Sequence, residues 1–324
     1  MKLLRLAIAG IAMAVTVLSA QAQEYPNRPV RIVVPYAAGG GVDAAARLVA
    51  QHLTTALGQN FIVDAKPGGG TIIGTDMVAH SNADGYTLLL TGGSTMTLLP
   101  LTHQGKLPYE PLKDFVPVAM VSRIPFFLVT SAEQPYRSVK DLMDDAKAKQ
   151  GSLAYASNGI GATAHVGTEL LLRAAGARMV HVAYNGFAPA VSDLVTGRVT
   201  MVLVDVAPVK GQLQANKLRA LAVASAERSR FMPDVPTLAE AGYPGSEVEV
   251  WLALYAPAAT PKEVVSRVSA EVARFMAMPA TIEAFAKLGH ETDAGGPEVV
   301  RQRIVSEQKA FAPAVRAAGV GNGK

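Results

Sequence analysis

The alternation of short β-branched runs with amphipathic stretches constrains the fold of this chain more than any other feature. Segments 30–36, 60–65 and 85–92 are rich in valine, isoleucine and leucine, and the stretches between them have helical length and spacing. From Ala45 to Ala56, apolar residues recur every three or four positions, which gives a helix one apolar face for packing. Strands that alternate with such helices are typical of β-α-β units on a parallel sheet.

The alternation is interrupted once and then resumes. Residues 101–121 form a less regular, proline-rich connection, and strand-like and helix-like stretches alternate again from 125 to 225. After Thr260 the spacing is helical up to the glycine-rich tail. We therefore expect two α/β units followed by helices, without an internal sequence repeat.

The first 22 residues have the pattern of a secretory signal peptide. Lys2 and Arg5 precede an uncharged apolar core that ends at Ala20, and Ala20 and Ala22 form an A-x-A site. The core is shorter than the roughly 20 residues of a membrane-spanning helix. We expect export and cleavage near Ala22.

Removing this peptide leaves 324 − 22 = 302 residues and lowers the formal net charge from +4 to +2, because two basic and no acidic residues are lost. A chain of this length usually divides into more than one core. The absence of cysteine excludes disulfides, thiolate metal sites and cysteine nucleophiles. The low charge argues against nucleic-acid binding, and we expect no cofactor and no metal.

Two extended runs with proline in or beside them, 116–129 and 248–258, stand at the two ends of the second unit. The simplest arrangement makes both runs cross between two lobes as a hinge, with the ligand cleft between the lobes. We expect a first lobe of residues 23–124 and 254–324 and a second lobe of residues 125–253.

Small, donor-rich loops follow several of the predicted strands. In parallel α/β sheets, ligands bind outside the carboxyl ends of the strands. Glycines let the backbone approach a bound group closely, and the free N–H groups of a helix's first turn suit an anion. The candidate ligand-binding residues are Tyr36, Ala38, Gly39, Gly40, Asp43, Gly93, Ser94, Ser157, Gly159, Gly161, Thr163, His165, Tyr184, Asn185 and Asp205.

Several of these residues have an alternative structural role. The glycine-rich loops also fit ordinary tight turns of an α/β fold, and His165 can be structural or line the cleft. Asp43, in the first turn of a predicted helix, is expected mainly to cap that helix. Asp205 can either cap the helix that starts near Ala207 or accept a hydrogen bond from the ligand.

These segments, taken together and in order, resemble the Bug family of extracytoplasmic solute receptors. The resemblance rests on the stretches YPNRPVRIVVPYAAGGGVDAAARLVAQHL, GQNFIVDAKPGGGTIIGTDMVA, LPYEPLKDFVPVAMV, GSLAYASNGIGATAHVGTELL and HVAYNGFAPAVSDLVTGRV, and it covers nearly the whole mature chain. Receptors of this family serve tripartite tricarboxylate transporters in the inner membrane.

The resemblance implies a type II periplasmic-binding-protein fold, a periplasmic location, a monomer and a small organic carboxylate as ligand. It places the family's first-loop motif on Tyr36–Asp43 and its second motif on Ser157, Gly159, Gly161 and Thr163. Members hold the ligand carboxylate through backbone amides, hydroxyls and ordered water without an arginine, and no Arg or Lys occurs in 36–43, 91–95 or 157–163. The implied partner is the transporter's permease.

Three departures from the family pattern bear on ligand identity. Ala38 stands where the family often has proline, Ala183–Gly186 replaces Pro-Tyr-Lys-Gly, and Ala65–Gly68 replaces Asn-Arg-Pro-Gly. Asn185 lies on the side expected to contact the distal end of the ligand. The sequence therefore leaves open whether the carboxylate is aliphatic, aromatic or an amino acid.

Two other classes of function remain as alternatives. A ligand-loaded receptor can signal to a membrane kinase, and the sequence does not separate signalling from transport. An exported hydrolase would need a nucleophile and a base, but Ser94 lies in GGSTM instead of G-x-S-x-G, and His165 is not part of an H-E-x-x-H motif. We therefore assign no catalytic residue and expect a binding protein.

Overall fold

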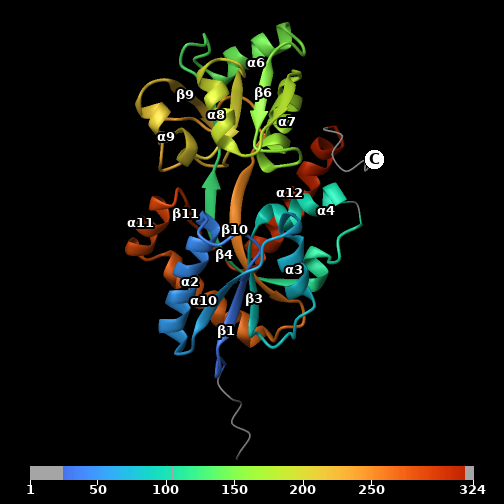
Figure 1. The fold of residues 1–324 in the computed structure, drawn as a ribbon, viewed down its shortest axis with the longest axis vertical. Coiled ribbons are helices and arrows are strands. Elements are labelled where there is room, and N and C mark those ends of the chain that lie inside the picture. The colour runs from blue at the N-terminus through green and yellow to red at the C-terminus, as the bar shows by residue number, and fades with distance from the viewer. Residues whose placement is uncertain (1–24, 104, 318–324) are drawn as a thin grey trace, which may run out of the picture.

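The computed structural model describes residues 25–103 and 105–317. The signal peptide expected at residues 1–22 lies outside these ranges. The chain folds into two lobes, each built around its own sheet, with two strands passing between them (Figure 1).

The first lobe contains a six-stranded sheet in the order β11-β4-β10-β3-β1-β2. Strands β1, β2 and β3 are parallel, and β10 is antiparallel to both of its neighbours. The strands are β1 (Val30–Val34), β2 (Phe61–Ala65), β3 (Thr87–Gly92), β4 (Phe115–Pro125), β10 (Glu249–Pro257) and β11 (Glu291–Thr292). The helices are α2 (Gly41–Leu57), α3 (Ile72–Ala79), α4 (Gly93–His103), α5 (Pro111–Asp114), α10 (Lys262–Met276), α11 (Pro279–Lys287) and α12 (Pro297–Ala317), with a 3-10 turn at Gly69–Thr71.

The second lobe contains a five-stranded sheet in the order β7-β6-β8-β5-β9. Strand β6 runs parallel to β7 and β8, whereas β5 is antiparallel to β8 and β9. The strands are β5 (Phe127–Ser131), β6 (Ala154–Ser157), β7 (Val180–Ala183), β8 (Met201–Val204) and β9 (Leu218–Val223). The helices are α6 (Val139–Ala148), α7 (Thr163–Ala175), α8 (Phe187–Val195) and α9 (Val206–Gln214).

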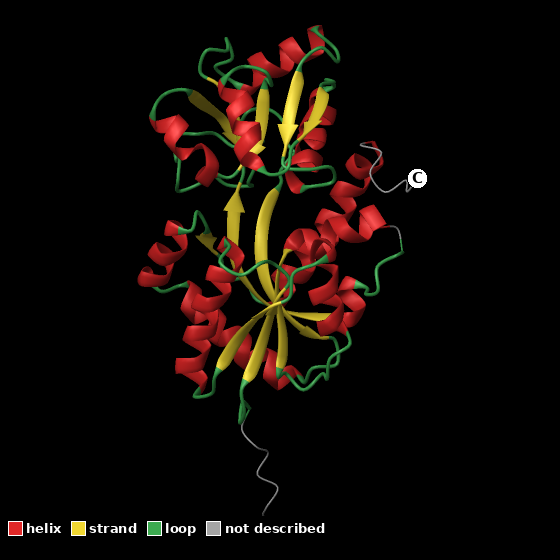
Figure 2. Cartoon of the chain, in the orientation of Figure 1, coloured by secondary structure: helices red, strands yellow, loops and turns green. Residues whose placement is uncertain are grey.

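Helices cover both faces of each sheet (Figure 2), so the central strands are apolar on both sides. Ile32 and Val33, neighbours on β1, are both fully buried, and they belong to separate core clusters on opposite faces of the sheet. This explains why the strands appear in the sequence as continuous apolar runs and not as alternating ones.

The two lobes are joined by the segments that the sequence pattern predicts to cross. Strand β4 ends at Pro125 in the first sheet, and β5 begins at Phe127 in the second. On the return path, Val248 N–H still donates to Ala224 O in the second lobe, and Glu249 already pairs with Pro125. The expected lobe boundaries, 124/125 and 253/254, fall within the crossing strands β4 and β10, and they remain proposals.

Two elements differ from the expectation. Helix α4 extends to His103, inside the connection expected to be irregular, although it contains Pro100. Because proline has no N–H, Pro100 leaves the carbonyl of Met96, four residues earlier, without its helical donor. Gln308 Nε2 of α12 donates to this carbonyl instead, at 2.9 Å. The short strand β11 interrupts the C-terminal helices, where its residues pair with Arg123 and Ser122 of β4. Among the described residues, no helix is both long and apolar enough to span a membrane.

Candidate ligand-binding site

A cavity of about 700 Å³ lies between the two lobes. Helices α2 and α4 begin beside it in the first lobe, and α7 begins beside it in the second. Neither α2 nor α7 has a side-chain cap at its N-terminus. The cavity is lined by Pro35, Tyr36, Ala37, Val42, Pro67, Gly68, Gly70, Thr71, Ser94, Leu98, Leu99, Thr102, Asn158, Gly159, Ile160, Gly161, Ala162, Thr163, Val250 and Leu252.

Five of the candidate residues therefore line the cavity. They are Tyr36, Ser94, Gly159, Gly161 and Thr163. The hydroxyls of Tyr36, Ser94 and Thr163 can donate hydrogen bonds to an anion. That they contact the ligand remains a prediction, and the other ten candidates do not line this cavity.

Asp43 shapes the first loop from inside. Its carboxylate accepts hydrogen bonds from Gly39 N–H at 3.0 Å and from Arg47 Nε at 2.8 Å. The hydrogen bond from Arg47 is the main reason that the pKa of Asp43 is lowered. Gly39 has φ +84°, a conformation that favours glycine. Asp43 therefore holds the turn at Ala38–Gly40 and has its acceptors occupied.

The turn from β3 into α4 is constrained by two aromatic residues. A Cβ on Gly93 would lie 2.1 Å from Cε2 of the buried Trp251, so no other residue fits without movement of that ring. Tyr36 OH accepts a hydrogen bond from Gly92 N–H at 3.2 Å. Packing against Trp251 thus explains why position 93 is a glycine, whereas Ser94 beside it lines the cavity.

In the second lobe, two stacked histidines support the loop between β6 and α7. The rings of His165 and His181 lie 3.8 Å apart, with an interplanar angle of 12°. His165 Nδ1 accepts from Gly161 N–H at 3.0 Å, and His181 Nε2 lies 2.6 Å from Ser157 Oγ. Ser157 is fully buried and also contacts Gly159. These three candidates, Ser157, His165 and Gly161, therefore form one hydrogen-bonded support for the loop.

Burial favours the neutral form of both imidazoles. Desolvation lowers the pKa of His165, and desolvation together with His165 lowers the pKa of His181 to about 4. Neutrality is required here, because a protonated Nδ1 on His165 could not accept from Gly161 N–H.

The last three candidates lie outside the cavity. Tyr184 OH donates to Asp193 at 2.8 Å, and Asn185 is exposed. Asp205 accepts from Ala207 N–H at 3.0 Å and caps α9, and burial raises its pKa. Of the two roles left open for Asp205, capping is the one present in this structure.

Sequence reasoning missed part of the cavity wall. Segment Pro67–Thr71 begins two residues after the end of β2, and its three glycines were a signal of the same kind as those in the first loop. Leu98, Leu99 and Thr102 lie on α4, and Val250 and Leu252 on β10. No sequence pattern marks these five residues. Whether they line the cavity depends on which face α4 turns toward it and on the register of β10 in the sheet.

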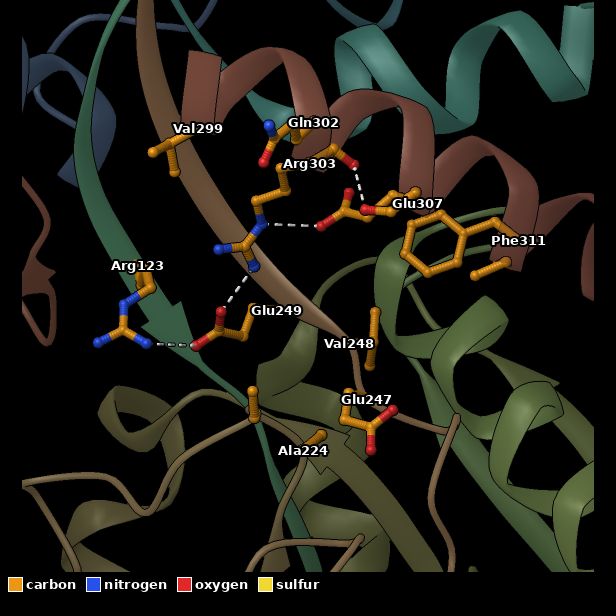
Figure 3. A pocket seen from close by; sticks show the side chains of 13 residues that line it. Arg123, Ala224, Glu247, Val248, Glu249, Val299, Gln302, Arg303, Glu307 and Phe311 are labelled. Carbon is orange, nitrogen blue, oxygen red and sulfur yellow. Dashed lines mark hydrogen bonds and ion pairs between the residues drawn. The ribbon is translucent and has the colours of Figure 1, made fainter. Parts of the chain in front are cut away.

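A second cavity, of about 590 Å³, lies on the crossing strands beside α12 (Figure 3). Arg303 of α12 points toward β10, where its Nη2 lies 2.6 Å from Glu249 Oε2. Its Nε lies 3.0 Å from Oε1 of Glu307, one turn later on α12. Trp251 Nε1 also donates to Glu307, at 2.8 Å. Burial raises the pKa of Glu307 despite these donors.

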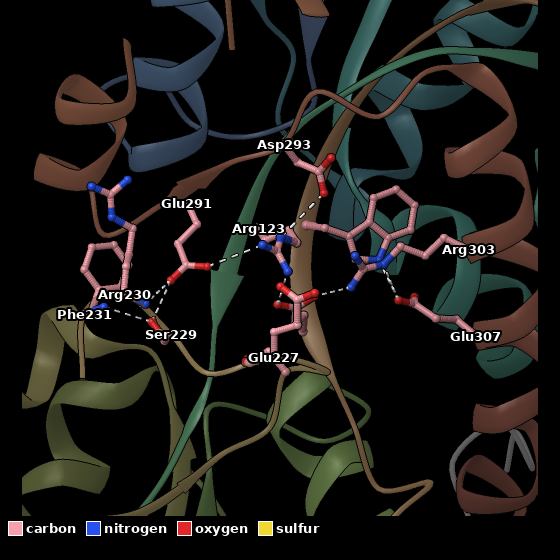
Figure 4. Close-up of polar contacts among 12 residues, drawn as sticks. Arg123, Glu227, Ser229, Arg230, Phe231, Glu291, Asp293, Arg303 and Glu307 are labelled. Carbon is pink, nitrogen blue, oxygen red and sulfur yellow. Dashed lines mark hydrogen bonds and ion pairs between the residues drawn. The ribbon is translucent and has the colours of Figure 1, made fainter. Parts of the chain in front are cut away.

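Arg123 extends this ion network toward the second lobe (Figure 4). Its guanidinium lies 3.5–3.8 Å from carboxylates of Glu249, Glu291 and Asp293. Glu291 in turn accepts from Ser229 Oγ at 2.7 Å and Arg230 N–H at 3.0 Å. Charged side chains thus join β4, β10, β11 and α12 to the second lobe at the hinge.

A sequence model described as tripartite tricarboxylate transporter family receptor matches residues 45–319. The chain belongs to this receptor family. Its members are substrate-binding receptors, so this receptor is not an enzyme, and the Ser157–His181 contact has a structural role. No group of three or more potential metal-ligating residues occurs within 25–103 and 105–317.

Named relatives span almost the whole receptor. It is 40% identical to the UPF0065 protein of the tcbD-tcbE intergenic region in Pseudomonas sp. strain P51, over 94% of this chain and 91% of the relative. It is 37% identical to BugT of Bordetella pertussis, over 97% of each. These matches confirm the family resemblance found in the sequence.

Solved structures confirm the fold. Rpa4515 of R. palustris with adipate is 33% identical, with a TM-score of 0.74 over 92% of this chain and 99% of that one. MatC of Rhodopseudomonas palustris with bound malate is 30% identical, with a TM-score of 0.70 over 90% of this chain and 100% of that one. The α/β, two-lobed periplasmic-binding-protein fold is therefore shared with receptors that hold carboxylates.

Proposed function

We propose that this receptor captures a small organic carboxylate between its lobes in the periplasm and delivers it to the permease of a tripartite tricarboxylate transporter. The observation that carries the proposal is the interlobe cavity, which takes its walls from both lobes and lies beside the uncapped N-termini of α2 and α7. Helix N-termini suit anions, because their free N–H groups and dipole favour negative charge.

The chemistry of the wall supports capture without reaction. Ser94 and Thr163 supply hydroxyls from opposite lobes. Asn158 also reaches the cavity, and its Oδ1 is buried with no hydrogen-bond partner within the described ranges. Ordered water can connect such groups to a carboxylate at little enthalpic cost. The adipate and malate held by the two structural relatives are ligands of this class.

A thermal-shift screen of residues 23–324 tests the proposal. The protein is first unfolded and refolded to remove carried-over ligand, and is then screened against aliphatic di- and tricarboxylates, aromatic acids and amino acids. A ligand at 100 times its Kd adds about 2.7 kcal/mol, which raises Tm by several degrees at roughly 2–4 °C per kcal/mol. A saturable shift with a carboxylate supports capture, and no shift across the panel contradicts it.

Delivery to the permease needs a cellular test. Deleting the gene should abolish uptake of the ligand that the screen finds, and restoring the gene should restore it. Unchanged uptake with altered transcription would instead assign the receptor to signalling.

A further inference from the structure

We propose that the interlobe cavity selects carboxylates with an apolar body, aliphatic or aromatic, over short or hydroxylated di- and tricarboxylates. This inference rests on the proposed function and concerns the same cavity. It comes from how charge and apolar surface are distributed over the wall.

No Asp, Glu, Lys, Arg or His is among the residues of the described chain that line this cavity. Tyr36 is the one lining residue with a titratable side chain, and its OH already accepts from Gly92 N–H. A carboxylate in this cavity therefore depends on N–H groups, hydroxyls and water. Each further charged group on the ligand adds a desolvation cost without a cationic partner to offset it.

Polar and apolar side chains occupy different parts of the wall along α4. Ser94 lies in the first turn of α4, and Leu98 follows four residues later on the same helical face. One turn separates them, a rise of about 6 Å. A ligand with its carboxylate at the start of α4 and α7 therefore has its next carbons beside leucine.

Further apolar side chains enclose this region from three other elements. Val42 comes from α2, and Val250 comes from β10. Ile160 comes from the second lobe, where its side chain is 73% exposed on the loop that faces the first lobe. When the lobes close over a ligand, Ile160 can pack against an apolar body.

The expected selectivity follows from burial. Each methylene moved from water into such surroundings raises affinity about fourfold. Adipate and succinate carry the same two carboxylates and differ by two methylenes, so adipate should bind at least tenfold more tightly. Tricarballylate has the six carbons of adipate and a third carboxylate, and it should bind more weakly than adipate.

Titration calorimetry on the ligand-stripped protein tests this with succinate, adipate, tricarballylate, malate, citrate and benzoate, together with two variants. Ile160→Ser should reduce the adipate-to-succinate affinity ratio to about threefold or less. Ile62→Ser is the matched control, because Ile62 is also an exposed isoleucine (54%) but lies on β2 and does not line the cavity. It should retain the wild-type ratio.

The outcomes separate this inference from the proposed function. If succinate, malate or citrate binds as tightly as adipate and benzoate, or if Ile160→Ser leaves the ratio unchanged, the apolar selectivity is wrong and carboxylate capture stands. If no acid in the series binds, the proposed function itself fails. Urea midpoints of both variants near the wild-type value exclude loss of folding as the cause.

Discussion

Gly93 illustrates how one residue can satisfy a functional pattern for a structural reason. Its place at the end of a strand predicts ligand contact, yet the structure shows that it makes room for Trp251. The sequence does not show that Trp251 lies beside this glycine, because the two residues meet only through the pairing of β10 with β3. Ser94, one residue later, is where the same pattern does reach the cavity.

Gly93→Ala should therefore destabilise the fold. The added Cβ would overlap a ring that is fully buried and hydrogen-bonded to Glu307. Overpacking of this kind costs about 1–3 kcal/mol, measured as a lower free energy of unfolding in urea. Gly211→Ala in α9 is the control, since its added Cβ meets nothing within 4 Å beyond its chain neighbours and the nearby backbone of its own helix. It should be neutral or stabilising, and equal stability of the two variants would contradict this packing account.

The stacked histidines predict acid sensitivity. His181, whose pKa is lowered from 6.5 to about 4, binds a proton less readily when folded than when unfolded. The free energy of unfolding should therefore be unaffected above about pH 6.5 and should decrease as the pH falls from 6.5 to about 4. His165, Tyr155, Glu169 and Ser157 surround this ring, and Glu169 opposes the shift.

Urea denaturation at pH 7.5 and pH 5.0 checks this prediction. His181→Gln keeps a hydrogen-bonding group near Ser157 and cannot titrate, so its loss of stability between these pH values should be smaller than in the wild type. An unchanged loss in His181→Gln would exclude this ring as a source of the pH dependence.

At the scale of elements, the sequence predicts those whose signal is local. Strands β1 to β3 follow from continuous apolar runs, and helices α2 and α7 follow from apolar residues at three- and four-residue spacing. Glycines predict the loops between them. Helix α4 was not predicted, because Pro100 interrupts the helical pattern and Gln308, more than 200 residues away, completes its hydrogen bonding. The leucine wall of the cavity was missed together with that helix.

Arg303→Met should be strongly destabilising, because α12 is held to β10 through this side chain. The change removes the guanidinium that pairs with Glu307, whose side chain is 14% exposed. It also removes the nearer of the two guanidinium groups beside Glu249, whose side chain is 6% exposed. Breaking a buried ion pair from one side costs about 3–5 kcal/mol. Arg301→Met is the matched control on the same helix, since its pair with Glu298 is exposed. A loss in Arg303→Met no larger than in the control would show that the network contributes little.

At the scale of the whole molecule, both lobes contribute walls to the interlobe cavity, and an ion network ties them at the hinge. The alternation of strands and helices predicts two α/β units, and the family resemblance implies their hinged arrangement. Neither reveals which residues of α4 and β10 line the cavity, because that depends on how the units are placed in space. The central claim is that both lobes hold one carboxylate.

Titration calorimetry of wild type, Ser94→Ala and Thr163→Val, with a carboxylate selected by the thermal-shift screen, tests this claim most directly. Each variant removes one cavity-lining hydroxyl, from the first and the second lobe respectively. A hydrogen bond to a charged group contributes about 1.5–3 kcal/mol, so each variant should bind at least tenfold more weakly than wild type. Wild-type affinity in both variants would contradict the claim that the ligand lies between the lobes.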